Sequence, residues 1–141
     1  MNNQEAFDTV VAHLRKQGRP SVFPSNALRG CAYRGADGLK CAAGCLIPDE
    51  MYSIHFECNT ISGLLTSDAR IYSRVNSDEV DYHKLVELTA PLREHLKDVD
   101  PELVRDLQMI HDFKRVELWE QEFRTLAERR ELAYTPPGGS E

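Results

Sequence analysis

The chain has 141 residues, of which 41% are hydrophobic and 28% charged, and its formal net charge is −6 at pH 7. This length and composition are typical of one globular domain with its own hydrophobic core. The negative charge argues against a general nucleic-acid binder, because phosphate contacts need a basic surface, and no apolar run is long enough to span a membrane.

The charge is unevenly distributed along the chain. Residues 1–47 carry a formal charge of +3, whereas residues 48–141 carry −9. A small anion would therefore bind to the N-terminal third, and the acidic remainder would suit a basic partner. The alternative for the acidic part is a solvated surface that keeps the protein in solution.

The N-terminal segment predicts a helix that ends at Gly18. Asn2 and Glu5 have the spacing of a capping box. Apolar residues recur on one helical face at Phe7, Val10, Val11 and Leu14. Residues 19–30, which include two prolines, form a connecting loop in this prediction.

Residues 31–49, CAYRGADGLKCAAGCLIPD, combine three of the four cysteines with three of the eight glycines. Two short runs flank Gly-Ala-Asp-Gly, whose residues tolerate positive φ, so we expect a β-hairpin at about residues 31–41. The apolar residues that follow suit one or two buried helical turns that Pro48 ends. The hairpin would then deliver Cys41 to a helix start.

The second half of the chain predicts further helices. Asn59-Thr60 caps a short helix that runs through Leu65, and Ser77-Asp78-Glu79 begins another, with a kink or corner near Pro91. Asp100-Pro101-Glu102 has the pattern of a helix N-terminus. From there one long helix is possible, or two with a break near residues 112–115.

The expected fold is therefore mainly α, a small helical domain over residues 1–133 with one short β-hairpin (about residues 31–41) packed on the helices. The tail 134–141, rich in proline and glycine, has no packing pattern and is expected to be disordered.

A resemblance rests on C-x-Y-R-G-x-x-G-L-K-C-A-x-G-C-L-I-P-D at residues 31–49. It extends to AFDTVVAHLRKQGRPS at 6–21, LQMIHD at 107–112 and a Trp-containing helix downstream. From about Phe7 to Leu132 the chain resembles an uncharacterised family of small bacterial and phage proteins. The resemblance implies a phage or mobile-element setting and no particular mechanism. Members similar to this chain can carry alanine where Cys45 stands here.

The four cysteines raise the question of a metal. Zinc is held by four sulfur or nitrogen ligands, usually in closely spaced pairs, and the chain offers Cys31, Cys41, Cys45 and Cys58 with His55 as a further ligand. Among the four cysteines, Cys41-x3-Cys45 alone has a paired spacing. The alternative is that the thiols fill a tight core beside glycines. We expect no cofactor, and zinc is the metal that these residues would suit.

Cys41 is also the candidate catalytic residue. A thiol at a helix N-terminus beside Lys40 would have a lowered pKa, and His55 or His111 could act as its base, with Asp112 orienting the imidazole. The His111-Asp112 pair does not indicate a phosphohydrolase of the HD type, because that pattern needs a later aspartate and the chain has none after Asp112. The alternative for Cys41 is close packing.

The candidate ligand-binding residues are Tyr33, Arg34, Lys40 and Cys41. Glycine-rich backbone and two cations could hold a phosphate, and the tyrosine could stack on a base. The alternative is that Arg34 locks the hairpin onto the helices through an acid such as Asp49.

The sequence thus predicts a small accessory protein of the bacterial host's cytoplasm that acts by binding, leaning away from an enzyme. In a counter-defence role it would sequester a nucleotide-like anion or mask a host defence protein. The partners expected are a host or phage protein or a small anionic nucleotide, with no membrane and no general nucleic-acid binding. A cysteine-nucleophile enzyme and a structural zinc protein are the alternatives.

Overall fold

The computed structural model describes residues 1–21, 32–57, 59–66 and 82–138. The described residues are mainly helical and include five α-helices: α1 Asn3–Gln17, α2 Ile61–Thr66, α3 Tyr82–His95, α4 Pro101–Phe113 and α5 Trp119–Arg129. Short 3-10 helices connect them: η1 Ala36–Gly38, η2 Gly44–Leu46, η3 Asp49–Met51, η4 Ile54–Phe56 and η5 Val116–Leu118. None of the described helices combines the length and apolar composition that a membrane crossing needs.

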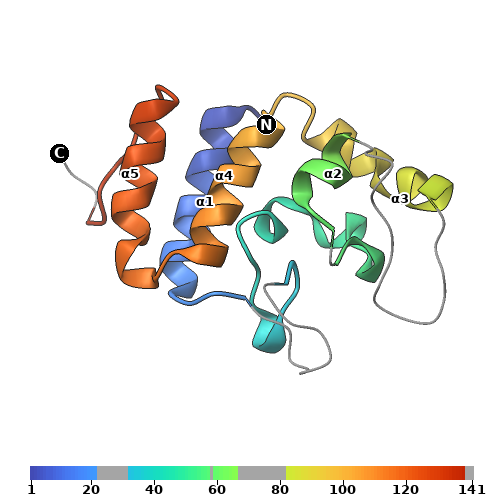
Figure 1. The fold of residues 1–141 in the computed structure, drawn as a ribbon, viewed down its shortest axis with the longest axis horizontal. Coiled ribbons are helices and arrows are strands. Elements are labelled where there is room, and N and C mark those ends of the chain that lie inside the picture. The colour runs from blue at the N-terminus through green and yellow to red at the C-terminus, as the bar shows by residue number, and fades with distance from the viewer. Residues whose placement is uncertain (22–31, 58, 67–81, 139–141) are drawn as a thin grey trace.

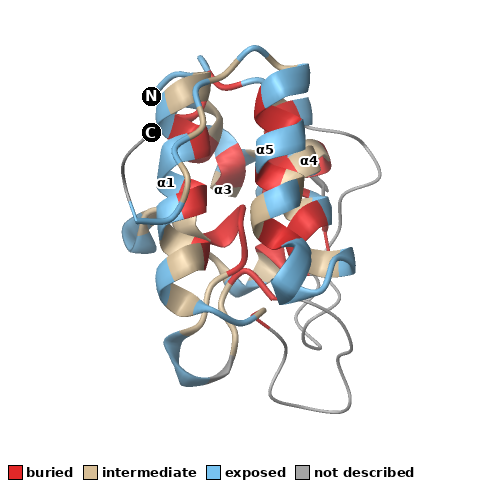
Figure 2. Cartoon of the chain, turned by 90° about the vertical axis from the view of Figure 1, so that its left-hand side faces the viewer, coloured by how far each residue is buried: buried red, intermediate tan, exposed pale blue. Residues whose placement is uncertain are grey.

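The helices pack in two groups that α4 joins. On one side α4 packs against α1 and α5, and on the other it packs against α2, which also contacts α3 (Figure 1). Buried positions lie on the inner faces of α1 and α5 (Figure 2). The segment 32–57 runs beneath these helices with little regular structure, so side chains must hold it in place.

The expected helix boundaries at both ends of the core are confirmed. Asn2 and Glu5 form the capping box of α1, and Gly18 ends the helix with a φ of 69°. Asp100 caps α4 by accepting a hydrogen bond from the Glu102 N–H. α4 ends at Phe113 and α5 begins at Trp119, so this part of the chain forms two helices and not one long helix.

The predicted β-hairpin at residues 31–41 is wrong. Asp37 and Gly38 do adopt positive φ and make a tight turn, but the described residues contain no strand on either side of it. The Gly35 N–H donates to the Leu39 carbonyl across the turn at 2.8 Å, but the pairing goes no further, because the N–H groups of Tyr33 and Arg34 bind the carboxylate of Glu57. Cys31 lies outside the described residues.

Two other expectations need comment. α3 continues through Pro91 to His95, so no helix-to-helix corner forms there, and its expected start at residues 77–79 lies outside the described residues. Tyr134, which we assigned to the tail, donates a hydrogen bond to Glu120 of α5, and its ring lies under the guanidinium groups of Arg15 and Arg124.

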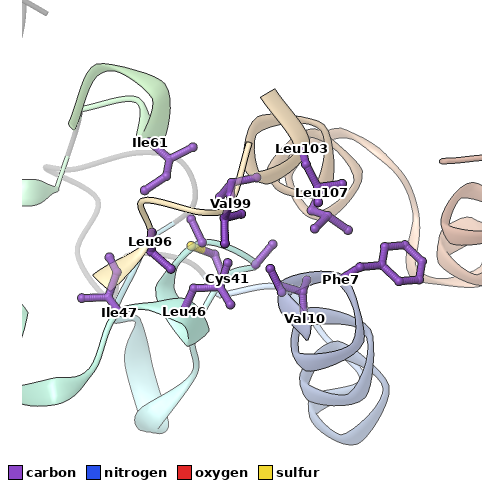
Figure 3. Close-up of a cluster of buried hydrophobic side chains, with 14 of the residues drawn as sticks. Phe7, Val10, Cys41, Leu46, Ile47, Ile61, Leu96, Val99, Leu103 and Leu107 are labelled. Carbon is purple, nitrogen blue, oxygen red and sulfur yellow. The ribbon is translucent and has the colours of Figure 1, made fainter. Parts of the chain in front are cut away.

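Cys41 belongs to the hydrophobic core. Figure 3 shows it among Leu46, Leu96 and Val99, with α1 on one side and α4 on the other. Its exposed fraction is 1%. The core therefore includes the segment 32–57 as well as the helices, and that segment's position is fixed by packing.

Gly44 allows this segment to fold back on itself. A Cβ atom added there would lie 2.3 Å from the carbonyl oxygen of Tyr33, closer than atoms can approach. Because the clashing atom is backbone, no side-chain rotation relieves the contact. The sequence position 44 therefore requires glycine.

We expect Gly44→Ala to lower the free energy of unfolding by about 2–4 kcal/mol, since the added methyl group must displace the backbone at Tyr33. Urea denaturation measures this as a lower midpoint at unchanged slope. Gly38→Asn is the control, because Gly38 has a φ of 74° and open space around it, and asparagine tolerates that conformation. Equal stability of Gly44→Ala and the unmodified protein would contradict the packing described.

Candidate functional site

The last turn of α1 holds the backbone of Lys40. The Oε1 atom of Gln17 accepts from the Lys40 N–H at 2.9 Å, and the Gln17 amide nitrogen donates to the Lys40 carbonyl at 2.8 Å. The Nε2 atom of His13 lies 3.1 Å from the same carbonyl. Because a carbonyl oxygen only accepts, that His13 nitrogen carries a proton. Lys40 thus extends from a fixed point beside α1.

A cleft with a volume of about 490 Å³ lies at this junction. We call it the basic cleft, and among the residues that line it are His13, Lys16, Gln17, Gly38, Lys40 and Cys45. No acidic residue lies within ion-pair distance of Lys16 in the described part of the chain. Lys40 forms an ion pair with Asp49 at 3.5 Å, and the Asp49 side chain is 79% exposed. The Lys40 ammonium, followed by Arg34, lowers the pKa of the Asp49 carboxyl.

A second hollow of about 400 Å³ opens beside α2 and α4. We call it the acidic cavity, and among the residues that line it are Cys41, Glu57, Gln108, Met109, Asp112 and Phe113. Its two carboxylates contrast with the lysines of the basic cleft. Arg105 also lines the acidic cavity, so its lining has two carboxylates and one guanidinium group. Both hollows include residues of the segment 32–57.

The carboxylate of Glu57 replaces the missing strand partner. It accepts hydrogen bonds from the backbone N–H groups of Tyr33 at 3.0 Å and Arg34 at 3.1 Å, and from the Tyr52 hydroxyl at 2.6 Å. Glu57 is 1% exposed. A buried carboxylate is tolerated when its lone pairs are satisfied, and these three donors satisfy it.

A chain of hydrogen bonds joins α4 to the neighbouring loops. The Ala43 N–H donates to Gln108 at 2.9 Å, and the Gln108 amide donates to the Oδ1 atom of Asp112 at 2.6 Å. The same oxygen lies 2.8 Å from Nδ1 of His111. On the other side of the ring, Nε2 of His111 accepts from the Ser21 N–H at 2.9 Å. His111 is therefore the neutral tautomer with its proton on Nδ1, which it donates to Asp112.

The structure does not bring the four predicted ligand-binding residues into one site. Tyr33 and Cys41 line the acidic cavity, whereas Lys40 lines the basic cleft. Arg34 lines neither, because its guanidinium group binds inside the segment. It donates to the carbonyls of Gly44 and Ile47, each at 2.6 Å, and pairs with Asp49 at 3.0 Å. The Arg34–Asp49 pair that we considered as the structural alternative is present.

Cys41 lies in surroundings that oppose a thiolate. Burial raises the pKa of its thiol well above the ordinary value, and the negative charges of Asp112 and Glu57 raise it further. Both ring nitrogens of His111 are engaged by Asp112 and Ser21, so that imidazole is not oriented to take the Cys41 proton. His55 lies in η4 and lines neither hollow. The arrangement favours close packing as the role of Cys41.

The structure describes two of the four cysteines that were considered as zinc ligands. Cys31 and Cys58 lie outside the described residues, and Cys41 and Cys45 line different hollows. Across the described ranges, no group of three or more histidine, cysteine or acidic side chains is placed to hold a metal ion. Burial raises the pKa of the Cys45 thiol to about 12, with Lys40 and Arg34 opposing that rise.

Several residues of the two hollows were missed by sequence reasoning. The sequence analysis did not single out His13, Lys16 or Gln17. Met109 and Phe113 are 42% and 72% exposed on α4. The sequence did contain a signal for these two residues. Their spacing of four residues places them on one face of the helix, outside the buried face of Leu103, Leu107 and Ile110.

Comparisons of the chain with protein families, with curated proteins and with solved structures found no match. The functional interpretation therefore depends on the geometry of the two hollows.

Iodoacetamide labelling tests the state of the described thiols. We expect Cys41 to stay unmodified in the folded protein at pH 7, because its buried thiol cannot form a thiolate or reach the reagent. We expect Cys45 to react more slowly than an ordinary thiol at pH 7 and faster as the pH rises, because burial raises the pKa of its thiol. Peptide mass spectrometry assigns the labelled positions.

The protein unfolded in urea is the control, in which both cysteines should react at the rate of an ordinary thiol. Rapid modification of Cys41 in the folded protein would contradict the buried position and would support the cysteine-nucleophile alternative.

Proposed function

We propose that the protein acts by binding, as a small accessory protein of a phage or mobile element in the cytoplasm of its host, and that the basic cleft takes a nucleotide-like anion. The observation that supports this function most is the convergence of Lys16 and Lys40 on one hollow beside α1. The sequence resemblance supports the proposed setting, and the cleft supports the proposed site.

The size and charge of the basic cleft suit such a ligand. Its volume of about 490 Å³ is within the usual range for small-molecule sites. Lys16 has no acidic neighbour in ion-pair contact among the described residues, so its charge is available to a phosphate. Ammonium groups bind phosphate as point charges and add donors in flexible directions.

The ion pair of Lys40 does not prevent ligand binding. Exposed ion pairs contribute only about 0–1 kcal/mol, and Asp49 is highly exposed. A phosphate carries more charge than one carboxylate and can replace Asp49 as the partner of Lys40. The backbone of Lys40 is already fixed by Gln17 and His13, so little ordering is needed on binding.

Masking of a host defence protein is the second candidate, and a different observation favours it. Phe113, the last residue of α4, and Val116 and Leu118 of η5 are close in sequence and between 36% and 72% exposed. Exposed apolar side chains are a feature of protein interfaces. This surface lies apart from the basic cleft residues in sequence, so variants can separate the two candidates.

Calorimetric titration with AMP and with inorganic phosphate tests the anion site. We expect AMP to bind more tightly than phosphate, and binding to weaken as salt rises, because the contacts are ionic. Lys16→Gln and Lys40→Gln should each weaken AMP binding about five- to tenfold.

Lys97→Gln is the matched control, because Lys97 pairs with Glu94 on the surface and does not line the cleft. It should bind AMP as the unmodified protein does. No heat of binding for AMP up to about 5 mM, or equal affinity in the Lys16→Gln and unmodified proteins, would remove the basis for the anion site.

A further inference from the structure

The acidic cavity is a second site, separate from the proposed anion site. Its volume of about 400 Å³ would enclose a small molecule, and its residues come from α2 and the two residues before it, from α4 and from the segment 32–57. Neither Lys16 nor Lys40, the two lysines of the basic cleft, lines the acidic cavity. The chemistry of its walls therefore has to be considered by itself.

Negative charge dominates the polar part of the cavity. Asp112 uses its Oδ1 atom for Gln108 and His111, and neither partner carries a positive charge when the imidazole is neutral. The Asp112 side chain is 24% exposed, and no lysine or arginine of the described residues lies within ion-pair distance of it. Glu57 adds a second carboxylate. A carboxylate without a cation partner at the wall of a cavity favours a cationic ligand.

Arginine does not cancel this charge. Arg105 lines the same cavity, but its side chain is 54% exposed and its guanidinium group pairs with Glu102 on its own helix at 3.5 Å. The raised pKa of the Cys41 thiol has the same physical origin in part, because Asp112 and Glu57 both disfavour a further negative charge there. The two carboxylates therefore disfavour an anionic ligand in the acidic cavity.

The apolar part of the cavity comes from α4. Met109 and Phe113 lie one helical turn apart, and both line the cavity while remaining 42% and 72% exposed. Exposed side chains of this size are unusual on a helix whose other apolar residues are buried. A methionine and an aromatic ring at one opening offer an adaptable contact for a ligand's apolar body and a face for a cation.

We propose that the acidic cavity binds a small organic amine with an apolar body, with its ammonium group toward Asp112 and its body against Met109 and Phe113. The hydrogen bonds of the cavity remain intact on binding, because the ligand uses the carboxylate oxygen that Gln108 and His111 leave free. This site does not depend on the anion site.

Methionine methyl spectra provide a specific test. The chain has three methionines, and among Met1, Met51 and Met109 the cavity is lined by Met109 alone. The probes are phenethylamine, 2-phenylethanol and phenylacetate, which share a ring and differ in charge. We expect phenethylamine to shift the Met109 methyl signal and to bind at least tenfold more tightly than phenylacetate, with the alcohol between them.

Two variants separate charge from shape. Asp112→Asn keeps an oxygen for Gln108 and His111 but removes the charge, so it should reduce phenethylamine affinity about tenfold and leave the alcohol unaffected. Phe113→Ala should weaken all probes about threefold or more. Ile54→Ala is the control, because Ile54 is 44% exposed and does not line the cavity.

Each alternative result overturns the proposal. Phenylacetate binding as tightly as the amine, a full response to the amine in Asp112→Asn, or no Met109 shift with phenethylamine would show that the cavity does not select organic cations. AMP should leave the Met109 signal in place, so failure of this site and failure of the anion site are distinguished in one set of spectra.

Discussion

The carboxylate of Glu57 is the interaction on which the rest of the structure depends. Residues 32–34 lie beneath the helices without a strand partner, and Glu57 binds two of their backbone N–H groups together with the Tyr52 hydroxyl. Removing an acceptor from a buried donor costs about 1–3 kcal/mol, so three such bonds fix the segment strongly. Once residues 32–34 are fixed, Arg34 can reach the carbonyls of Gly44 and Ile47. The segment is then a rigid support for both hollows.

This support explains why the two hollows differ in charge. Cys41 is buried in the core and borders the acidic cavity. Its sequence neighbours Lys40 and Cys45 line the basic cleft instead. Residues of α1, from the positively charged third of the chain, complete the basic cleft. Residues of α4, from the acidic remainder, complete the acidic cavity. The uneven charge of the sequence therefore becomes two separate electrostatic environments within one domain.

Local signals predicted the helices well and the central segment poorly. Capping at Asn2 and Asp100 depends on neighbouring residues, so the sequence shows it directly. The hairpin prediction recognised the turn at Asp37 and Gly38 but missed that Glu57, more than twenty residues away, takes the flanking backbone donors. The sequence analysis also grouped Tyr33, Arg34, Lys40 and Cys41 into one binding site, and the structure separates them. Adjacent residues of the segment 32–57 line different hollows, and tertiary contacts determine which hollow each residue lines.

Amide hydrogen exchange at Tyr33 and Arg34 tests the central claim most directly. If Glu57 holds this segment, both amides exchange slowly in the unmodified protein although neither belongs to a strand or helix. In Glu57→Gln their protection falls selectively, because the amide nitrogen brings a donor where a second acceptor is required. Amides of α1 that remain protected in the variant would show that the loss is local. Fast exchange of Tyr33 and Arg34 in the unmodified protein would contradict the account.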